Sequence, residues 1–143
     1  MQKILYVTPH LSTGGAPQYL LKKIELLNDQ YDIYVAEYND YGIFRVQKDE
    51  IITLLGKKHK TISERREELL EWIDEISPDI IHFEEMPELF NIEDEIATKI
   101  YSKDRPYKIF ETSHDSSFDL KLKKYFPDKF LFCSDNQLIK FRS

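Results

Sequence analysis

The sequence of 143 residues has a single cysteine and no long apolar run. One cysteine, Cys133, excludes a disulfide framework and a cysteine-based metal site. It lies in the apolar run Phe130–Cys133, which favours a buried thiol over a reactive one. No apolar stretch approaches the roughly 20 residues that cross a bilayer, and the N-terminus lacks the pattern of a signal peptide. We therefore expect a cytoplasmic protein.

Positive charge is also scarce, with 20 lysines and arginines against 26 aspartates and glutamates and a net charge of −6. Binding to a nucleic-acid backbone needs a positive surface, so we expect no nucleic-acid partner. The fingerprints G-x-G-x-x-G and G-x-x-x-x-G-K-[ST] are absent, which argues against a dinucleotide-dependent enzyme and a P-loop NTPase. The 41% hydrophobic content and the length are typical of one soluble globular domain.

Short apolar segments alternate with helical patterns along the chain. Strands are predicted at 3–7, 32–38, 79–83, 107–112 and 129–133, with one or two short edge strands between 44 and 55. Helices are predicted at 16–27, 61–76, 91–101 and 118–125, and another begins at 134. Such alternation predicts right-handed βαβ crossovers. The predicted fold class is α/β: a Rossmann-like, doubly wound, mostly parallel sheet of about six strands in a single domain.

Two local patterns refine this prediction. The segment Thr61–Glu64 matches the S/T-x-x-E capping box, which predicts a helix start. The near-continuous apolar strands predict a sheet buried on both faces. The residues expected to be mostly buried are Ile4, Leu5, Val7, Ile33, Val35, Ile80, Ile81, Ile109, Phe110, Leu131 and Cys133.

Open parallel sheets bind ligands beyond the carboxyl ends of their strands, so the residues after each strand are candidate site residues. His10, Gly14 and Gly15 follow the first strand and precede a helix. Glycines there let the backbone approach a phosphate, and a helix N-terminus carries partial positive charge. A tight turn without a ligand is the alternative. His10 is a further candidate for ligand contact.

His114 is the strongest histidine candidate because it follows a strand and has Asp115 beside it to orient the ring. An imidazole there can donate a hydrogen bond to a phosphate or hydroxyl oxygen. His82 is expected to be a satisfied strand residue, and His59 to be solvated in a lysine-rich loop. The histidines lie on separate strands without a His-x-x-x-His pair, so we predict no metal.

Two further segments have a structural and a functional interpretation. Either Glu84 or Glu85, after a strand, can accept a hydrogen bond from a sugar hydroxyl, or both are solvated loop carboxylates. The segment Lys121–Phe126 is either a solvated helix face or a weak peripheral contact with an anionic membrane.

Four segments resemble, in matching order, the N-terminal half of glycosyltransferase family four. The likeness extends over the whole chain, and each segment occurs where that family has a similar one. The segments are Lys3–Val7 followed by Gly14-Gly15-Ala16, then Pro78–His82, then Thr112–Asp115, and finally Phe132–Asp135. Pro17 or Gln18 stands where the family often has glutamate.

The resemblance implies a two-domain GT-B, retaining, nucleotide-sugar-dependent enzyme. The chain 1–143 would be its acceptor-side domain, and the C-terminal nucleotide-sugar-binding domain would be absent from it. By match, His114 is the expected catalytic residue, and Gly14 and Gly15 lie near the donor phosphates. His10 is our own further candidate for binding the donor phosphates or lining the cleft. Glu85 and Asp115 are our candidates for acceptor binding.

The expected function is therefore a hexosyltransferase-type step in glycan or cell-surface polysaccharide synthesis. The sugar of a nucleotide sugar passes to a hydroxyl acceptor without a cofactor, and the isolated chain is expected to be inactive. The alternative is a non-catalytic α/β binding or interaction module that kept the fold.

Overall fold

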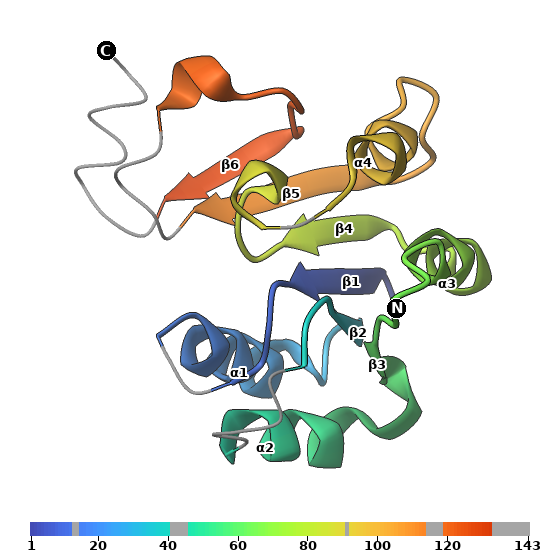
Figure 1. Ribbon diagram of the computed structural model, residues 1–143. Helices are drawn as coiled ribbons and strands as arrows, with labels where there is room; N and C mark the ends of the chain where they lie inside the picture. The colour runs from blue at the N-terminus through green and yellow to red at the C-terminus, as the bar shows by residue number, and fades with distance from the viewer. Residues whose placement is uncertain (13–14, 41–45, 91, 114–118, 133–143) are drawn as a thin grey trace.

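The computed structural model describes residues 1–12, 15–40, 46–90, 92–113 and 119–132. Its centre is one six-stranded sheet in which every pairing is parallel and the strand order is β3-β2-β1-β4-β5-β6 (Figure 1). The strands are β1 (Lys3–Thr8), β2 (Asp32–Glu37), β3 (His59–Thr61), β4 (Ile80–Phe83), β5 (Lys108–Ser113) and β6 (Lys129–Phe132). The predicted α/β class and parallel sheet are confirmed.

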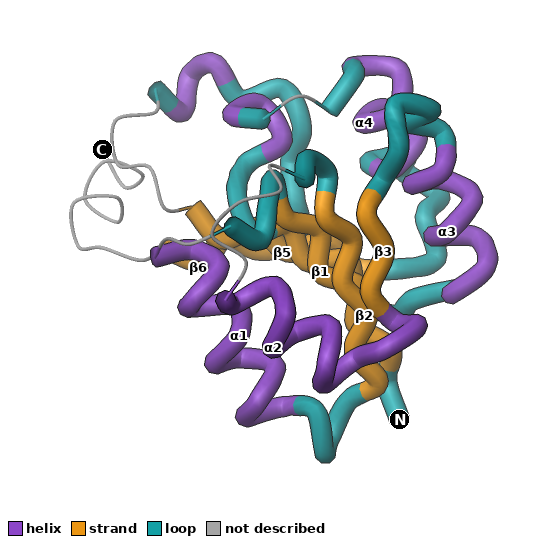
Figure 2. Tube along the Cα trace, turned by 60° about the horizontal axis from the view of Figure 1, so that its bottom comes forward, coloured by secondary structure: helices purple, strands orange, loops and turns teal. Residues whose placement is uncertain are grey.

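The helices cover the two faces of the sheet as a doubly wound fold requires. They are α1 (Gly15–Leu27), α2 (Val46–Leu55), α3 (Glu68–Ile76) and α4 (Asp94–Ile100), with 3-10 turns η1 (Gly56–Lys58), η2 (Pro87–Leu89) and η3 (Leu120–Leu122). Figure 2 shows α1 and α2 together on one face, with α3 and α4 on the other. No helix in the described ranges is long and apolar enough to span a membrane.

Each face has its own apolar core because successive strand residues point to opposite sides. The core under α1 and α2 includes Ile4, Tyr6, Leu20, Ile24, Ile33 and Val35. The core under α3 and α4 includes Leu5, Val7, Leu69, Trp72, Ile81 and Ile109. Each core forms where the apolar face of the helices, repeated every 3.6 residues, packs on the apolar strand residues, repeated every two residues.

The burial prediction holds for most of the named strand residues but fails in one region. Ile4, Leu5, Val7, Ile33, Val35, Ile81 and Ile109 are buried. Ile80, Phe110 and Leu131 are only half-buried, and all three line a groove of about 290 Å³ on the α1 face. Lys23 and Leu27 of α1 line the same groove, which leaves the three strand residues partly open. Cys133 lies outside the described residues.

The prediction of edge strands between residues 44 and 55 was wrong, because Val46–Leu55 forms helix α2. The β-branched run Ile51-Ile52-Thr53 suggested a strand. The buried residues Lys48, Ile51 and Leu55 instead follow at i, i+3 and i+7, which is one helical face. Residues 41–45, the start of the predicted segment included, are outside the described ranges.

The predicted helix start at Thr61 was also wrong. Thr61 ends the edge strand β3, where its hydroxyl donates to Glu37 Oε1 at 3.0 Å instead of capping a helix. The helix begins at Glu68. The side-chain contact expected of a capping serine or threonine is made by Ser63, two residues after Thr61, whose Oγ donates to Glu68 Oε1 at 2.7 Å. The three residues of β3 are polar and half-buried, so no apolar run in the sequence predicts this strand.

Four smaller differences concern two predicted helices and the solvation of two polar side chains. The helix predicted at 91–101 is α4, Asp94–Ile100, and the one predicted at 118–125 is only the turn η3. Lys123, expected on a solvated face, is buried, and the His59 side chain, expected in solvent, is 10% exposed against Glu37. The helix predicted from residue 134 lies outside the described residues.

Candidate functional site

The strand order creates a point where the chain diverges in two directions. From β1 the chain winds through α1 to β2 on one side, whereas from β4 it winds through α4 to β5 on the other. Because β1 and β4 are neighbours, the loops that leave their carboxyl ends separate there. Doubly wound folds bind ligands at such a point, so we searched this edge for polar side chains.

The loop after β1 is fixed by hydrogen bonds to its neighbours. The Tyr38 N–H donates to Thr8 O at 3.0 Å, and the Asn39 N–H donates to Pro9 O at 2.8 Å, which extends the β1–β2 ladder beyond the strands. Leu11 is fully buried below this loop. The backbone around His10 is therefore held in place on the β2 side.

His10 has a defined tautomer in its neutral form. The Ser12 N–H donates to His10 Nδ1 at 3.2 Å, so the neutral ring carries its proton on Nε2. Burial lowers the pKa of His10, and the nearby Glu37 carboxylate opposes this shift only in part. At neutral pH the ring is therefore an uncharged Nε2–H donor, which suits a phosphate or hydroxyl oxygen.

Glu37 connects the loop after β1 with α2 and β3. Its Oε2 accepts the Leu11 N–H at 2.9 Å, and its Oε1 lies 2.7 Å from Lys48 Nζ. Thr61 Oγ1 and the His59 ring are its other neighbours. Burial alone would raise the pKa of Glu37, but the contacts with His59, Lys48 and the Leu11 N–H outweigh burial and lower it. The carboxylate is a buried, charged anchor.

A second polar chain crosses from α1 to β4 and β5. Lys23 Nζ lies 2.6 Å from Glu84 Oε1, and the same oxygen is 3.8 Å from His82 Nε2. His82 Nε2 is in turn 2.6 Å from Thr112 Oγ1. The side chains of Lys23, His82 and Glu84 are 0–15% exposed, and the Thr112 residue is 1% exposed. The prediction that His82 is a satisfied strand residue is confirmed.

Aromatic rings surround this chain and continue into the groove on the α1 face. Lys23 Nζ lies 4.5 Å from the ring centre of Tyr19 and 5.5 Å from that of Tyr6. The Tyr6 and His82 rings are 5.1 Å apart. Burial and the Glu84 carboxylate raise the pKa of Tyr6, so its hydroxyl stays protonated. The polar chain thus forms one end of an otherwise apolar groove.

The structure describes three of the predicted site residues. His10 and Glu85 lie beyond the neighbouring strands β1 and β4, and Gly15 is the first residue of α1. The Glu85 side chain is half-buried, and its Oε1 accepts the Met86 N–H at 3.0 Å. Gly14, His114 and Asp115 lie outside the described residues. The predicted site is therefore described in part, with its described members on one edge of the sheet.

Sequence reasoning missed Lys23 and Glu37, although both leave a periodic signal. Lys23 interrupts the apolar stripe of α1 between Leu20 and Ile24, so a helix that buries this stripe must also bury the lysine. Glu37 continues the inward alternation of Ile33 and Val35 at the end of β2. A charged residue at an inward position of a buried element needs a partner.

The chemistry available at this edge is hydrogen bonding and positioning. His10 offers an uncharged donor, Gly15 begins a helix, and Glu85 offers a carboxylate. In the ranges that the structure describes, histidines, cysteines and carboxylates form no group of three or more able to hold a metal ion. The arrangement suits an oxygen-rich ligand such as a sugar or a phosphate.

A larger cavity, of about 560 Å³, lies at the opposite edge of the sheet. The ends of α3 and α4 and the loop before β5 line it, with Ser77, Asp79 and Tyr107 among its residues. By volume alone this cavity would be the better ligand site, but open parallel sheets bind ligands at the carboxyl edge. We therefore place the candidate site at the carboxyl edge and not at this cavity.

No protein-family model matches this sequence, and no curated protein matches it. Function is therefore inferred from the fold, the geometry of the carboxyl edge and the four resembling segments.

Proposed function

We propose that this chain is the acceptor-side domain of a GT-B glycosyltransferase that transfers a sugar from a nucleotide sugar to a hydroxyl acceptor. One observation carries the proposal. The described parts of the four resembling segments lie on β1 and at the start of α1, on β4 and just before it, at the end of β5, and at the end of β6. These strands are consecutive neighbours in the sheet. Segments distant in sequence thus converge on one contiguous stretch of the sheet.

The described geometry also disfavours the main competing ligand of this fold. In dinucleotide-binding Rossmann domains an acidic residue about 20 residues after the glycine loop accepts a hydrogen bond from the ribose. Glu37 holds the corresponding position at the end of β2. It is 1% exposed and already contacts Leu11, Lys48 and Thr61. A ribose therefore has no access to this carboxylate.

In the proposed enzyme, the edge residues bind and orient rather than react covalently. His114 is the proposed catalytic residue, donating to the sugar or leaving phosphate as charge develops. The backbone at Gly14 and Gly15 and the uncharged His10 ring meet the donor phosphates. Glu85 and Asp115 accept hydrogen bonds from acceptor hydroxyls. No metal is invoked, because the helix N-terminus supplies positive potential.

A donor-binding domain completes the cleft in this proposal. The acceptor side alone keeps its ligand affinity, so the chain as given should bind acceptor glycans but not turn over a donor. The non-catalytic alternative also permits binding. It differs in one respect: binding need not depend on the two residues proposed to hold the acceptor.

The test is a binding screen of the 143-residue chain against defined oligosaccharides by saturation-transfer NMR. We expect binding to a subset of glycans, and about tenfold weaker binding in Asp115→Ala and Glu85→Ala, since each loses one hydrogen bond to an acceptor hydroxyl. Glu95→Ala is the matched control, because its carboxylate is 85% exposed on α4. Failure of every glycan to bind would contradict the proposal. If both variants bind glycans as tightly as wild type, the result would favour the non-catalytic module.

A further inference from the structure

Residues 119–126, called the strap below, join β5 to β6 and contain the turn η3. In Figure 1 the strap is the orange segment above β6, at the edge of the molecule. Its apolar residues Leu122 and Phe126 are 65% and 67% exposed, whereas Lys123 is 8% exposed. Of these three side chains only that of Lys123 is buried, so a charged residue fastens the strap together with Tyr125, which packs against the apolar core.

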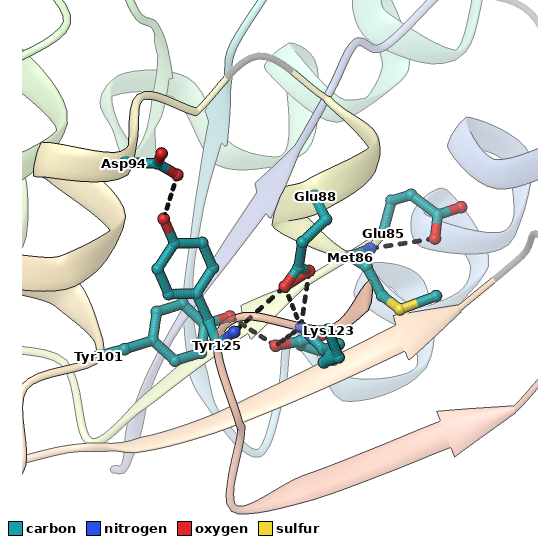
Figure 3. Close-up of polar contacts among 8 residues, drawn as sticks. Glu85, Met86, Glu88, Asp94, Tyr101, Lys123 and Tyr125 are labelled. Carbon is teal, nitrogen blue, oxygen red and sulfur yellow. Dashed lines mark hydrogen bonds and ion pairs between the residues drawn. The ribbon is translucent and has the colours of Figure 1, made fainter. Parts of the chain in front are cut away.

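The buried lysine is held by two carboxylates from different parts of the chain. Lys123 Nζ lies 2.5 and 2.7 Å from the two oxygens of Glu88, which belongs to η2 (Figure 3). It lies 3.0 and 3.2 Å from the two oxygens of Glu111, in the middle of β5. When all three groups are ionised, two negative charges surround one positive charge, so the cluster has one excess negative charge out of water.

The surroundings of Glu111 make that excess charge costly. Glu111 is fully buried, and its register neighbours on β4 and β6 are Phe83 and Phe130. Tyr101, at the end of α4, donates to Glu111 Oε2 at 2.6 Å. Among the described residues, Lys123, Glu88 and this hydroxyl are the titratable groups that act on Glu111. Burial raises the pKa of Glu111 to about 7, with Lys123 and Tyr101 opposing the shift and Glu88 adding to it.

The remaining contacts of the strap are few and partly exposed. The Tyr125 N–H donates to Glu88 Oε1 at 3.3 Å, and the Tyr125 hydroxyl donates to Asp94. The Tyr125 ring lies 5.4 Å from that of Tyr101. Lys124 and Asp94 form only an exposed pair, which contributes little. Release of Lys123 would thus leave the strap with Tyr125 as its main attachment.

We propose that Glu88, Lys123 and Glu111 form a proton-dependent clamp, which fastens the strap to the carboxyl half of the sheet when one proton is bound and loosens when that proton leaves. Opening exposes Glu111 to water, where a carboxyl group ionises more readily. Opening of the strap therefore releases one proton. Linkage then requires the opening constant to rise tenfold per pH unit between the pKa of the open form and that of the closed form.

Hydrogen–deuterium exchange of the full chain tests the clamp, with protection corrected for the intrinsic exchange rate at each pH. Protection of the strap amides should fall about tenfold per unit from pH 5 to pH 7 and level off above pH 7. Helix α3 (Glu68–Ile76) serves as the internal control and should show no such slope. A flat strap profile, or an equal slope in α3, would overturn the proposal.

Two variants separate the clamp from general packing. Glu111→Gln keeps the shape of the side chain and should abolish the slope while the strap stays protected at every pH. Lys123→Met keeps most of the length but loses the charge, so strap protection should fall at every pH while α3 stays protected. Glu95→Gln, on an exposed carboxylate, should behave as wild type. A slope that persists in Glu111→Gln, or full strap protection in Lys123→Met, would contradict the clamp.

Discussion

Glu37 Oε2 accepts a hydrogen bond of 2.9 Å from the backbone N–H of Leu11. The contact joins the end of β2 to the loop that follows β1, in which His10 lies. The same carboxylate neutralises Lys48, whose side chain is only 4% exposed. One buried acidic group thus fixes both the shape of a candidate ligand loop and the position of α2.

Replacing Glu37 with alanine should destabilise the fold strongly. The change leaves the Lys48 ammonium buried without its nearest carboxylate and removes the acceptor of the Leu11 N–H. Breaking a buried ion pair from one side costs about 3–5 kcal/mol. Urea unfolding followed by the fluorescence of Trp72 measures this loss. The exposed-site variant Glu95→Ala should unfold like wild type, and a loss below about 1 kcal/mol for Glu37→Ala would contradict the anchoring role.

The buried state of Glu37 also predicts ligand selectivity. Because this carboxylate is occupied by protein groups, NAD and NADP should not bind to the carboxyl edge. Isothermal titration calorimetry of the chain with each dinucleotide should give no heat of binding at millimolar concentration. Micromolar affinity for NAD or NADP would contradict this prediction and would indicate a dinucleotide-binding domain.

The chain of 143 residues should show no sugar transfer by itself. The acceptor-side domain forms only one side of the proposed cleft, so by itself it cannot exclude water or arrange charge around a leaving phosphate. The assay incubates the chain with radiolabelled nucleotide sugars and a mixed acceptor pool, and product is sought by chromatography. Donor-dependent transfer at any rate above background would show that the reacting groups lie within this domain.

Glu111 predicts a specific pH dependence of stability. Its pKa is about 7 in the folded protein against an ordinary value of 4.5, so the folded state keeps a proton that the unfolded state loses. The stability from this group is therefore complete below about pH 4.5 and is lost as the pH rises to about 7. A rise from 4.5 to about 7 corresponds to roughly 3 kcal/mol.

The variant Glu111→Gln isolates that contribution from other titrating groups. It should be more stable than wild type at pH 8, where the buried carboxylate is ionised, and similar at pH 5. Urea unfolding at the two pH values gives the difference. Equal stabilities at pH 8 would mean that Lys123 and Tyr101 compensate the burial of the charge completely.

The sequence predicts the regular parts of this fold because their periods are uninterrupted. Strand β1 and helix α1 have clean two-residue and 3.6-residue patterns, and both occur as expected. Helix α2 was mistaken for strands because Ile51, Ile52 and Thr53 favour strands locally. Its packing against α1 and the sheet overrides that preference. Strand β3 exists only through its pairing with β2.

The position of the candidate residues along the sheet edge was predictable, but their contact partners were not. The strand order brings His10 and Glu85 to neighbouring loops, as expected for residues that follow parallel strands. The partners of Lys23, Glu37 and Lys123 depend on contacts between residues 11 to 61 positions apart. No local pattern specifies such contacts, although a charge at an inward position indicates that a partner exists.

Chemical-shift mapping of the ¹⁵N-labelled chain during titration with a bound glycan tests the central claim most directly. The claim is that acceptors bind at the carboxyl edge of the sheet, beside Glu85 after β4. The largest shifts should appear at the amides of Glu84, Glu85 and Met86, with none at the cavity around Ser77, Asp79 and Tyr107. Shifts concentrated at that opposite cavity, or spread evenly over the surface, would contradict the account.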